Sequence, residues 1–270
     1  MRGLKAPVRD EVLDAAICRP LGRWIARRLG PRGITANQVT LFTAALGVIT
    51  GVFYAAPLPW PVLGGCLFFF AMVFDCVDGE LARRYGGGDW RGRIFDGLAD
   101  GVTAFSVLIG MVVHLGRSGI SVFGYTPKTF EWLVIFLPAG ASFMWHSAVV
   151  DNLKQRLKRG SIDNTLGSFA SEPKNAFDRV SYALLVSYVR WMQRSTGSSC
   201  PGGYLCFRRV QWVGPTHHHF LMMIAALCIG AWPRAYLGYW VFAVVIANLY
   251  MVATLWISRN TWRKASTSLT

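Results

Sequence analysis

The chain has 270 residues, of which 53% are hydrophobic and 16% charged, and its mean hydropathy is +0.35. A soluble domain carries roughly 25% charged residues, whereas several stretches here run for about 20 residues with almost no charge, the length that crosses ~30 Å of hydrocarbon. These features argue against a soluble protein and predict an all-α integral membrane protein.

Residues 1–33 are predicted to form an amphipathic cytoplasmic segment. Charged and apolar residues interleave at helical spacing, so no cleavable signal peptide is predicted. The apolar positions of the predicted helix are Val12, Leu13, Ala16, Leu21, Trp24, Ile25 and Leu29. This face fits a lipid surface with arginines at the headgroups, and packing against the cytoplasmic ends of a helix bundle is an equal alternative.

Residues 34–258 are predicted to form one membrane domain of six transmembrane helices. The expected segments are 35–57, 60–82, 94–115, 130–150, 217–232 and 235–257. The second and third are joined by a short glycine-rich turn and must be antiparallel neighbours. Residues 151–214 form a cytoplasmic connection with a predicted surface helix in NAFDRVSYALLVSYVRWMQR, and 259–270 form a cytoplasmic tail.

The basic residues define the expected orientation. On this topology 25 of the 28 Lys and Arg residues fall on the side of the two termini, and the other side holds only Arg117, Lys128 and Arg234. The positive-inside rule therefore places both termini in the cytoplasm. Attraction to anionic lipid explains the net charge of +14, so no nucleic-acid partner is predicted.

The six cysteines predict no disulfide framework, because three lie in apolar segments where a free thiol behaves as a small hydrophobe. Cys200 and Cys206 fall in the predicted cytoplasmic connection, where a bridge is disfavoured. A zinc site joining them to His217–His219 is an alternative, although their spacing is uncommon for structural zinc.

Four aspartates stand at the facing ends of the second and third segments. Asp75 and Asp78 are three residues apart, and Asp96 and Asp100 four apart, so each pair shares a helix face. A carboxylate near the hydrocarbon costs several kcal/mol unless it is paired, hydrated or metal-bound. Two antiparallel helices would bring all four together, and hard oxygen ligands suit Mg²⁺ or Mn²⁺. A structural polar cluster or an ion pathway is the alternative.

Residues between the acids suit a phosphate ligand. Ala82 lies on nearly the same face as Asp75, and Gly79 and Gly92 remove side chains where a ligand could approach the backbone. Arg83 offers a fixed positive charge to a phosphate oxygen.

These residues fit the motif D-x2-D-G-x2-A-R-x8-G-x3-D-x3-D without a gap, which resembles the signature of the CDP-alcohol phosphotransferases. The eight matching positions are Asp75, Asp78, Gly79, Ala82, Arg83, Gly92, Asp96 and Asp100. The six-helix layout resembles that family over residues 30–260.

The resemblance implies a pair of divalent ions, Mg²⁺ or Mn²⁺, held by the four aspartates, with Asp100 as general base and Asp96 beside it in the catalytic group. It places the CDP moiety against Asn37, Thr40, Asp78, Gly79, Ala82, Arg83, Asp89, Gly92 and Asp96. The sequence departs from the pattern of many relatives in three places: Ala36 replaces a proline, Gly88 and Asp89 stand where Ser or Thr is common, and Gly101 replaces Lys or Arg.

The acceptor side is less defined. Glu80 points away from the metal face and could contact an acceptor or cap a polar groove. Lys154, Arg156 and their basic neighbours could bind an acceptor phosphate or form a solvated face. His217 could meet an acceptor, although an interfacial role for His217–His219 is favoured, while His114 and His146 are expected as polar residues within the bundle.

The resemblance implies transfer of a phosphatidyl or related group from a CDP-activated donor, CDP-diacylglycerol above all, to a polar alcohol, with release of CMP in phospholipid biosynthesis. Inositol phosphate or a related polyol is the favoured acceptor, and glycerol phosphate, serine and choline stay open. The expected location is a bacterial or archaeal inner membrane, with the active site facing the cytoplasm; a homodimer is compatible. A membrane prenyltransferase and a divalent cation transporter are the competing functions.

Overall fold

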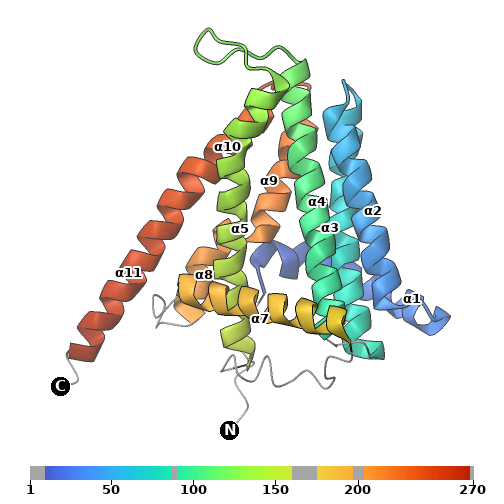
Figure 1. The fold of residues 1–270 in the computed structure, drawn as a ribbon, viewed down its shortest axis with the longest axis vertical. Helices are drawn as coiled ribbons and strands as arrows, with labels where there is room; N and C mark the ends of the chain where they lie inside the picture. The colour runs from blue at the N-terminus through green and yellow to red at the C-terminus, as the bar shows by residue number, and fades with distance from the viewer. Residues whose placement is uncertain (1–9, 87–89, 160–174, 197–203, 268–270) are drawn as a thin grey trace.

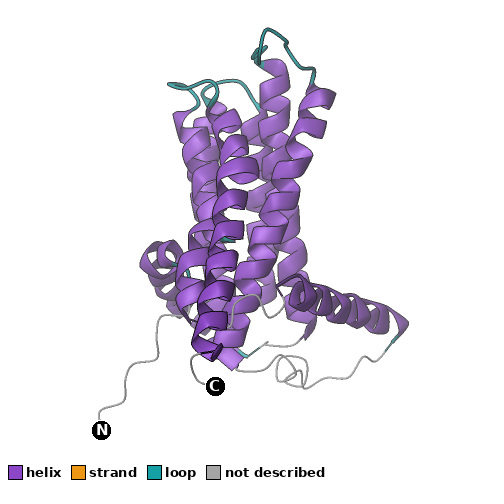
Figure 2. Ribbon diagram, turned by 90° about the vertical axis from the view of Figure 1, so that its left-hand side faces the viewer, coloured by secondary structure: helices purple, strands orange, loops and turns teal. Residues whose placement is uncertain are grey.

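The computed structural model describes residues 10–86, 90–159, 175–196 and 204–267, and these residues form an all-helical bundle without β-strands (Figures 1 and 2). Five helices are long and apolar enough to cross a membrane. They are α2 (Ala36–Ala55), α3 (Trp60–Tyr85), α4 (Trp90–Arg117), α5 (Thr129–Arg159) over its part Thr129–Lys154, and a C-terminal run over Ala235–Asn260. The all-α prediction is confirmed for the described residues, and five candidate spans among them agree with an integral membrane protein.

The helices extend beyond the apolar segments expected from hydropathy. α3 continues to Tyr85, α4 already begins at Trp90, and α5 continues to Arg159. Charged residues can continue a helix past the hydrocarbon because its backbone hydrogen bonds remain internal. The motif aspartates therefore lie inside regular helix rather than at its ends.

The fifth predicted segment, 217–232, is shorter than expected. α9 spans Pro215–Cys228, only 14 residues, and the chain then turns before α10 (Ala235–Val241) begins. A helix of that length rises about 21 Å, less than the ~30 Å hydrocarbon core. α9 nevertheless packs against α3, α5 and α10 inside the bundle. The six-span count is thus not confirmed by helix length.

Small residues let α2 and α4 approach closely. A Cβ at Gly51 would lie 2.4 Å from the Ser106 carbonyl oxygen, and one at Gly110 would lie 2.3 Å from the Gly51 carbonyl oxygen. Gly47, one turn earlier, faces Thr103 in the same way. Glycines spaced by four residues are a common means of packing membrane helices, since lipid offers no hydrophobic drive for association.

A buried polar chain ties α5 to the C-terminal helices. His218 lies with Nδ1 3.1 Å from the Tyr239 hydroxyl and Nε2 3.0 Å from His146 Nδ1, and His146 Nε2 lies 3.1 Å from Asn248 Oδ1. Because the Asn248 oxygen can only accept, each histidine donates from Nε2 and accepts at Nδ1, which satisfies every step with neutral rings. Asn248 also donates to Val244, in the π-helical segment Phe242–Ile246 that precedes α11 (Ala247–Thr267). His146 is confirmed as a polar residue within the bundle.

His114 is likewise a polar residue of the bundle, as predicted. Its Nδ1 lies 3.0 Å from the carbonyl oxygen of Ala56, at the end of α2. The carbonyl can only accept, so Nδ1 carries the hydrogen.

The N-terminal helix runs through a π-helical segment, Asp14–Cys18, into α1 (Arg19–Leu29) and packs on α3. Its buried face consists of Glu11, Asp14, Cys18, Gly22 and Ala26, whereas Leu21 and Trp24 are exposed. The helix therefore meets the bundle through small and acidic residues and leaves apolar side chains outside. Packing on the bundle, one of two alternatives from the sequence, is what this structure shows.

Glu11 explains why one histidine prediction is wrong. Its buried carboxylate accepts a hydrogen bond from the Thr216 amide at 3.1 Å and lies 3.6 Å from His217 Nδ1. An acid at the N-terminus of α9 is favoured by the free backbone N–H groups there. His217 and His218 are both buried, so the expected interfacial role does not hold for them.

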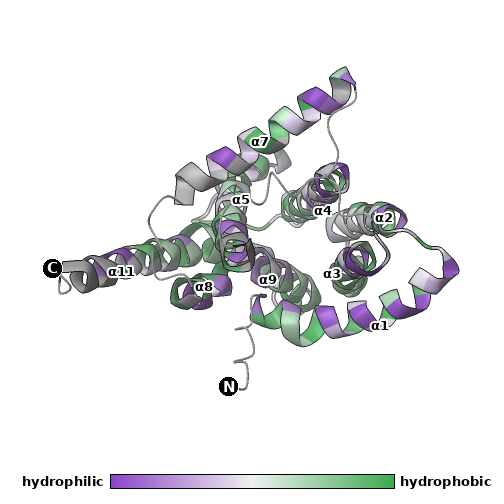
Figure 3. Cartoon of the chain, turned by 90° about the horizontal axis from the view of Figure 1, so that it is seen from below, coloured by the Kyte–Doolittle hydropathy of each residue, from purple (hydrophilic) through white to green (hydrophobic). Residues whose placement is uncertain are grey.

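The long connection between α5 and α9 contains α7 (Ala176–Thr196) and α8 (Tyr204–Val210). α7 confirms the predicted surface helix and lies across the ends of the spans, on the far side of the α3–α4 pair from α1 (Figure 3). Cys206, in α8, is disulfide-bonded, so the prediction of reduced cysteines is wrong there. Cys18, Cys66, Cys76 and Cys228 are free, and Cys200 lies outside the described residues.

Candidate functional site

The aspartate motif converges at the end of the bundle where α1 and α7 lie. Carboxylate oxygens of Asp75 and Asp78, from α3, and of Asp96, from α4, all lie within 4.8 Å of one another. Asp78 is buried, and the other two are partly buried. The predicted meeting of these three side chains is confirmed, and the group could hold a metal ion.

Asp100 lies beside this group rather than within it. It sits one helical turn after Asp96, and its carboxyl forms a side-chain hydrogen bond with that of Asp75. Its side chain is open to the surface of the protein, unlike that of Asp78. Asp100 is therefore placed at the edge of the cluster, where it also lines a cavity next to Asp75.

Thr40 connects α2 to the cluster. Its buried hydroxyl donates to Asp78 Oδ2 at 2.8 Å and lies 3.1 Å from the Ala36 carbonyl oxygen. Local sequence explains this position: Thr35 caps the helix by accepting from the Gln38 amide, while the Gln38 side chain accepts from the Thr35 amide. Asn37, in the same turn, is exposed.

The arginine of the motif is exposed and engaged within its own helix. Arg83 donates to Glu80 at 3.0 Å, and Arg84 donates to the other oxygen of Glu80 at 2.7 Å. Glu80 thus orients two arginines instead of facing the aspartates. A Cβ at Gly79 would lie 3.3 Å from Arg83 Nη1, so the bare backbone leaves room for that guanidinium.

The other residues predicted to contact the substrates lie at different distances from the aspartates. Lys154, on α5, lies within electrostatic range of Asp75, whereas His217 packs on Trp212 with ring centroids 5.1 Å apart. Ala82 and Gly92 are partly buried within α3 and α4. Asp89 and the side chain of Arg156 lie outside the described residues.

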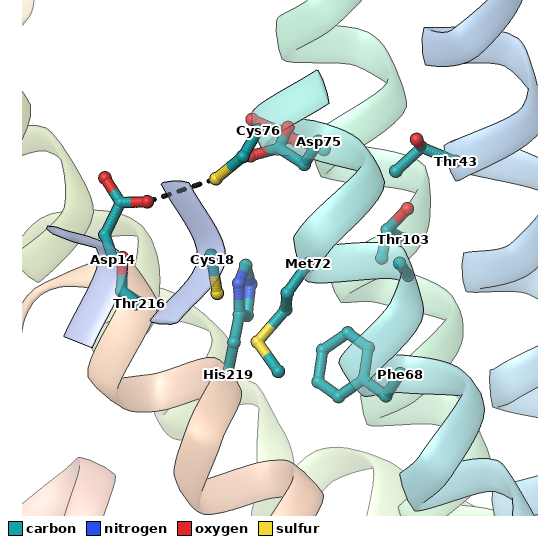
Figure 4. Close-up of a pocket in the computed structure, with 12 residues that line it drawn as sticks. Asp14, Cys18, Thr43, Phe68, Met72, Asp75, Cys76, Thr103, Thr216 and His219 are labelled. Atoms are coloured by element: carbon teal, nitrogen blue, oxygen red, sulfur yellow. Dashed lines mark hydrogen bonds between the residues drawn. The ribbon is translucent and has the colours of Figure 1, made fainter. Parts of the chain in front are cut away.

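A cavity of about 50 Å³ opens next to the aspartates (Figure 4). Its lining is Asp14, Cys18, Thr43, Phe68, Ala71, Met72, Asp75, Cys76, Asp100, Thr103, Thr216 and His219. No described residue partners His219 Nε2 or Thr103 Oγ1, and a polar space of this size can take up water.

The N-terminal helix supplies residues that sequence analysis missed. The Cys76 thiol donates to Asp14 Oδ1 at 3.1 Å, and Arg19 donates to Asp14 Oδ2 at 2.7 Å. Burial opposes the charge of Arg19, but Asp14 and Asp10 together hold the pKa of its guanidinium above the usual value. The available signal was the spacing of Glu11, Asp14 and Cys18, which places them on one helix face.

The chemistry of the donors fits a divalent cation. The converging ligands are carboxylate oxygens, which hard ions such as Mg²⁺ and Mn²⁺ prefer. Like charges at this separation would otherwise repel or retain protons. Asp75, Asp78 and Asp96 would hold the ion, with Thr40 orienting Asp78 as an outer hydrogen-bond partner.

Comparison with known proteins agrees with this geometry. Residues 33–155 match the sequence model of the CDP-alcohol phosphatidyltransferase family, the family that the aspartate motif resembles. The match contains all four motif aspartates and ends within α5.

Individual relatives match the same region. The phosphatidylinositol phosphate synthase of Mycobacterium marinum is 30% identical over 108 residues, which cover 40% of this chain and 44% of that protein. The synthase of the same name from Mycobacterium tuberculosis is 29% identical over 108 residues, 40% of this chain and 48% of that protein.

A bifunctional IPC transferase and DIPP synthase of Aquifex aeolicus is 32% identical over 109 residues, 39% of this chain and 24% of that protein. The chain thus spans less than half the length of these curated relatives. No solved structure matches the chain at a significant level.

The Thr40 contact generates a first prediction. Thr40→Val removes the hydrogen bond that orients Asp78, so Mn²⁺ affinity should fall by about tenfold, a typical effect of losing an outer partner of a ligand. Isothermal titration of the purified protein with Mn²⁺ measures the change. Thr43→Val is the matched control, because the Thr43 hydroxyl donates to the carbonyl oxygen of Val39 in its own helix at 3.0 Å and not to an aspartate. Equal Mn²⁺ affinity in wild type and Thr40→Val would refute the role of Thr40.

Proposed function

We propose that this protein transfers a phosphatidyl or related phospho-alcohol group from a CDP-activated lipid to the hydroxyl of a polar alcohol and releases CMP. The observation that carries the proposal is the convergence of Asp75, Asp78 and Asp96 within 4.8 Å, inside the region that matches the sequence model of the CDP-alcohol phosphatidyltransferase family. Two divalent ions, Mg²⁺ or Mn²⁺, are the cofactors of this proposal. When bound, they would neutralise diphosphate charge and stabilise the departing CMP.

The residues have distinct roles in this mechanism. Asp100, at the edge of the cluster, accepts the proton of the attacking hydroxyl as general base. Arg83 is exposed and ion-paired with Glu80, so its guanidinium can turn toward the CDP phosphates at the small cost of a surface ion pair. Thr40 holds Asp78 in place from α2. Gly79 and Gly92 keep the approach to the backbone open for the nucleotide.

An inositol phosphate or a related polyol is the acceptor we propose. Relatives that match the same region are named phosphatidylinositol phosphate synthases. Lys154 supplies a positive charge within range of Asp75, as the phosphate of such an acceptor would require. Glycerol phosphate, with its own phosphate, is the next candidate; serine and choline would leave Lys154 without a phosphate to bind.

We also propose six spans with both termini in the cytoplasm, α9 being the short fifth span in chain order. The described chain begins and ends at the same end of the bundle, where α1 and the end of α11 lie (Figure 1). That end carries the exposed arginines of α1, and the opposite connection carries few basic residues.

Labelling of single introduced cysteines tests this orientation. In intact cells an impermeant maleimide should modify Thr126→Cys, in the exposed connection between α4 and α5, and should leave Arg23→Cys unmodified until the cells are opened. Wild-type protein reports the background from native cysteines. Modification of Arg23→Cys alone would invert the topology.

Removal of metal ligands should abolish turnover. Asp75→Asn, Asp78→Asn and Asp96→Asn each replace a charged ligand by a neutral amide, so CMP release should fall by at least about 10³-fold with the protein still folded in detergent. EDTA should have the same effect, reversible by Mg²⁺ or Mn²⁺. Normal CMP release by any of the three variants would contradict the assignment. Transport of Mn²⁺ without CMP release from any CDP-alcohol would instead favour a cation transporter.

Asp100 should affect turnover more than donor binding. Asp100→Asn removes the proton acceptor, so the single-turnover rate should fall about 10²-fold or more while CDP-donor affinity changes little. Both quantities are measured on the same purified variant. An equal loss of rate and affinity that raised Mn²⁺ restores would show that Asp100 serves the metal and that the proton leaves by another group.

A further inference from the structure

α7 has an inner face that is bonded to the motif helix α4. The helix begins where the Asn175 side chain accepts from the Asp178 amide at 2.8 Å. Asp178 is buried and receives a hydrogen bond from Arg91 at 2.5 Å, and Tyr182, one turn further on, packs edge-on against Trp90 with ring centroids 5.6 Å apart. Two successive turns of α7 therefore hold the first two residues of α4.

The outer face of α7 is apolar and uncovered. Its exposed residues are Val180 (61% exposed), Leu184 (67%), Tyr188 (45%) and Trp191 (47%). Their spacing of four, four and three residues puts them on one stripe of the helix. Exposed arginines, Arg179 and Arg190, lie along one edge of this stripe. Apolar and aromatic residues beside a basic edge are typical of a helix that lies in a membrane interface.

The position of α7 favours lipid as the occupant of this stripe. The helix runs across the long axes of α4 and α5 near their ends, roughly in the plane that a membrane surface would occupy (Figures 1 and 2). Both neighbours expose large apolar side chains along their lengths, including Leu98 and Phe105 on α4 and Leu137 on α5. The stripe thus continues a surface that must face acyl chains.

Charge supports the same occupant. Tyr and Trp are enriched at membrane interfaces, and each basic residue near an anionic surface contributes about 1 kcal/mol of attraction. Arg179 and Arg190 would meet lipid phosphates while the stripe enters the acyl boundary.

We propose that α7 is an interfacial helix that binds an anionic lipid surface and, through Asp178–Arg91 and Tyr182–Trp90, fixes the beginning of α4. Arg91 directly precedes Gly92 and lies five residues before Asp96. A displacement of α7 would therefore move the α4 carboxylate relative to those of α3. Asp178 and Tyr182 act as positioning residues in this arrangement. The proposal does not depend on the transfer reaction.

Accessibility of nitroxide labels tests the lipid contact. Leu184→Cys places a label on the apolar stripe, and Ala183→Cys places one on its basic edge. The two sites are adjacent and exposed, and they lie about 100° apart around the helix. Each is labelled in full-length protein in nanodiscs of phosphatidylcholine and phosphatidylglycerol, and the shared native cysteines are subtracted with labelled wild type. The Leu184 label should collide with oxygen, which partitions into lipid, and the Ala183 label with a water-soluble nickel chelate.

Other outcomes overturn the proposal. Equal access of the nickel chelate to both labels would place the stripe in water. A Leu184 label that neither reagent reaches, with spin coupling between copies, would make the stripe an interface between two chains.

Metal affinity tests the positioning role. Asp178→Asn breaks the link to Arg91 and should weaken Mn²⁺ binding about fivefold, and Arg91→Gln should do the same. The double variant should be no weaker than either single one, since both remove one interaction. Ala183→Cys is the control and should bind Mn²⁺ as wild type does. Unchanged Mn²⁺ affinity in the folded Asp178→Asn and Arg91→Gln variants would reject the coupling while leaving the lipid contact to the label experiment.

Discussion

The structure is organised around three carboxylates that meet inside apolar helices. Oxygens of Asp75, Asp78 and Asp96 lie within 4.8 Å of one another, and such charges near hydrocarbon are costly without compensation. Several features of the fold supply it: Thr40 donates to Asp78, Lys154 places positive charge near Asp75, and the glycines of α2 bring the Thr40 helix close to α4. A divalent cation would complete the compensation, because it satisfies several oxygens at once.

Local spacing was enough to predict this cluster. Offsets of three residues in α3 and a short turn to α4 leave few ways to place Asp75, Asp78 and Asp96, so their convergence followed from helix geometry. The environment of the histidines could not be obtained in this way. His217 is covered by Glu11, more than 200 residues earlier in the chain, and His218 bonds to His146 and Tyr239 across three helices. Hydropathy records polarity at a position but carries no information on which distant helix covers it.

Length was also misjudged where hydropathy continues past the end of a helix. Residues 220–232 form an apolar run, yet α9 stops at Cys228 because the chain must turn before Pro233 and begin α10. The disulfide at Cys206 contradicts the expectation for a different reason. That expectation rested on the reducing conditions of the predicted compartment and not on the distance between cysteines. The reaction class was inferred from residue spacing within a short segment. The helix end and the disulfide depend instead on contacts and turns that this spacing does not determine.

Two amphipathic helices flank the motif from opposite sides. On one side the Cys76 thiol donates to Asp14 of the N-terminal helix, and on the other Arg91 donates to Asp178 of α7. In each case a buried acid of the flanking helix accepts a hydrogen bond from a neighbour of a motif residue: Cys76 follows Asp75, and Arg91 precedes Gly92. Both flanking helices also expose large apolar side chains on their outer faces. α1 lies before residue 33 and α7 lies after residue 155, so both flanking helices come from outside the region that matches the family model. A lipid-seated α7 would therefore support the matched region from outside it, so that α4 is held at its start by α7 and in its middle by the glycines of α2.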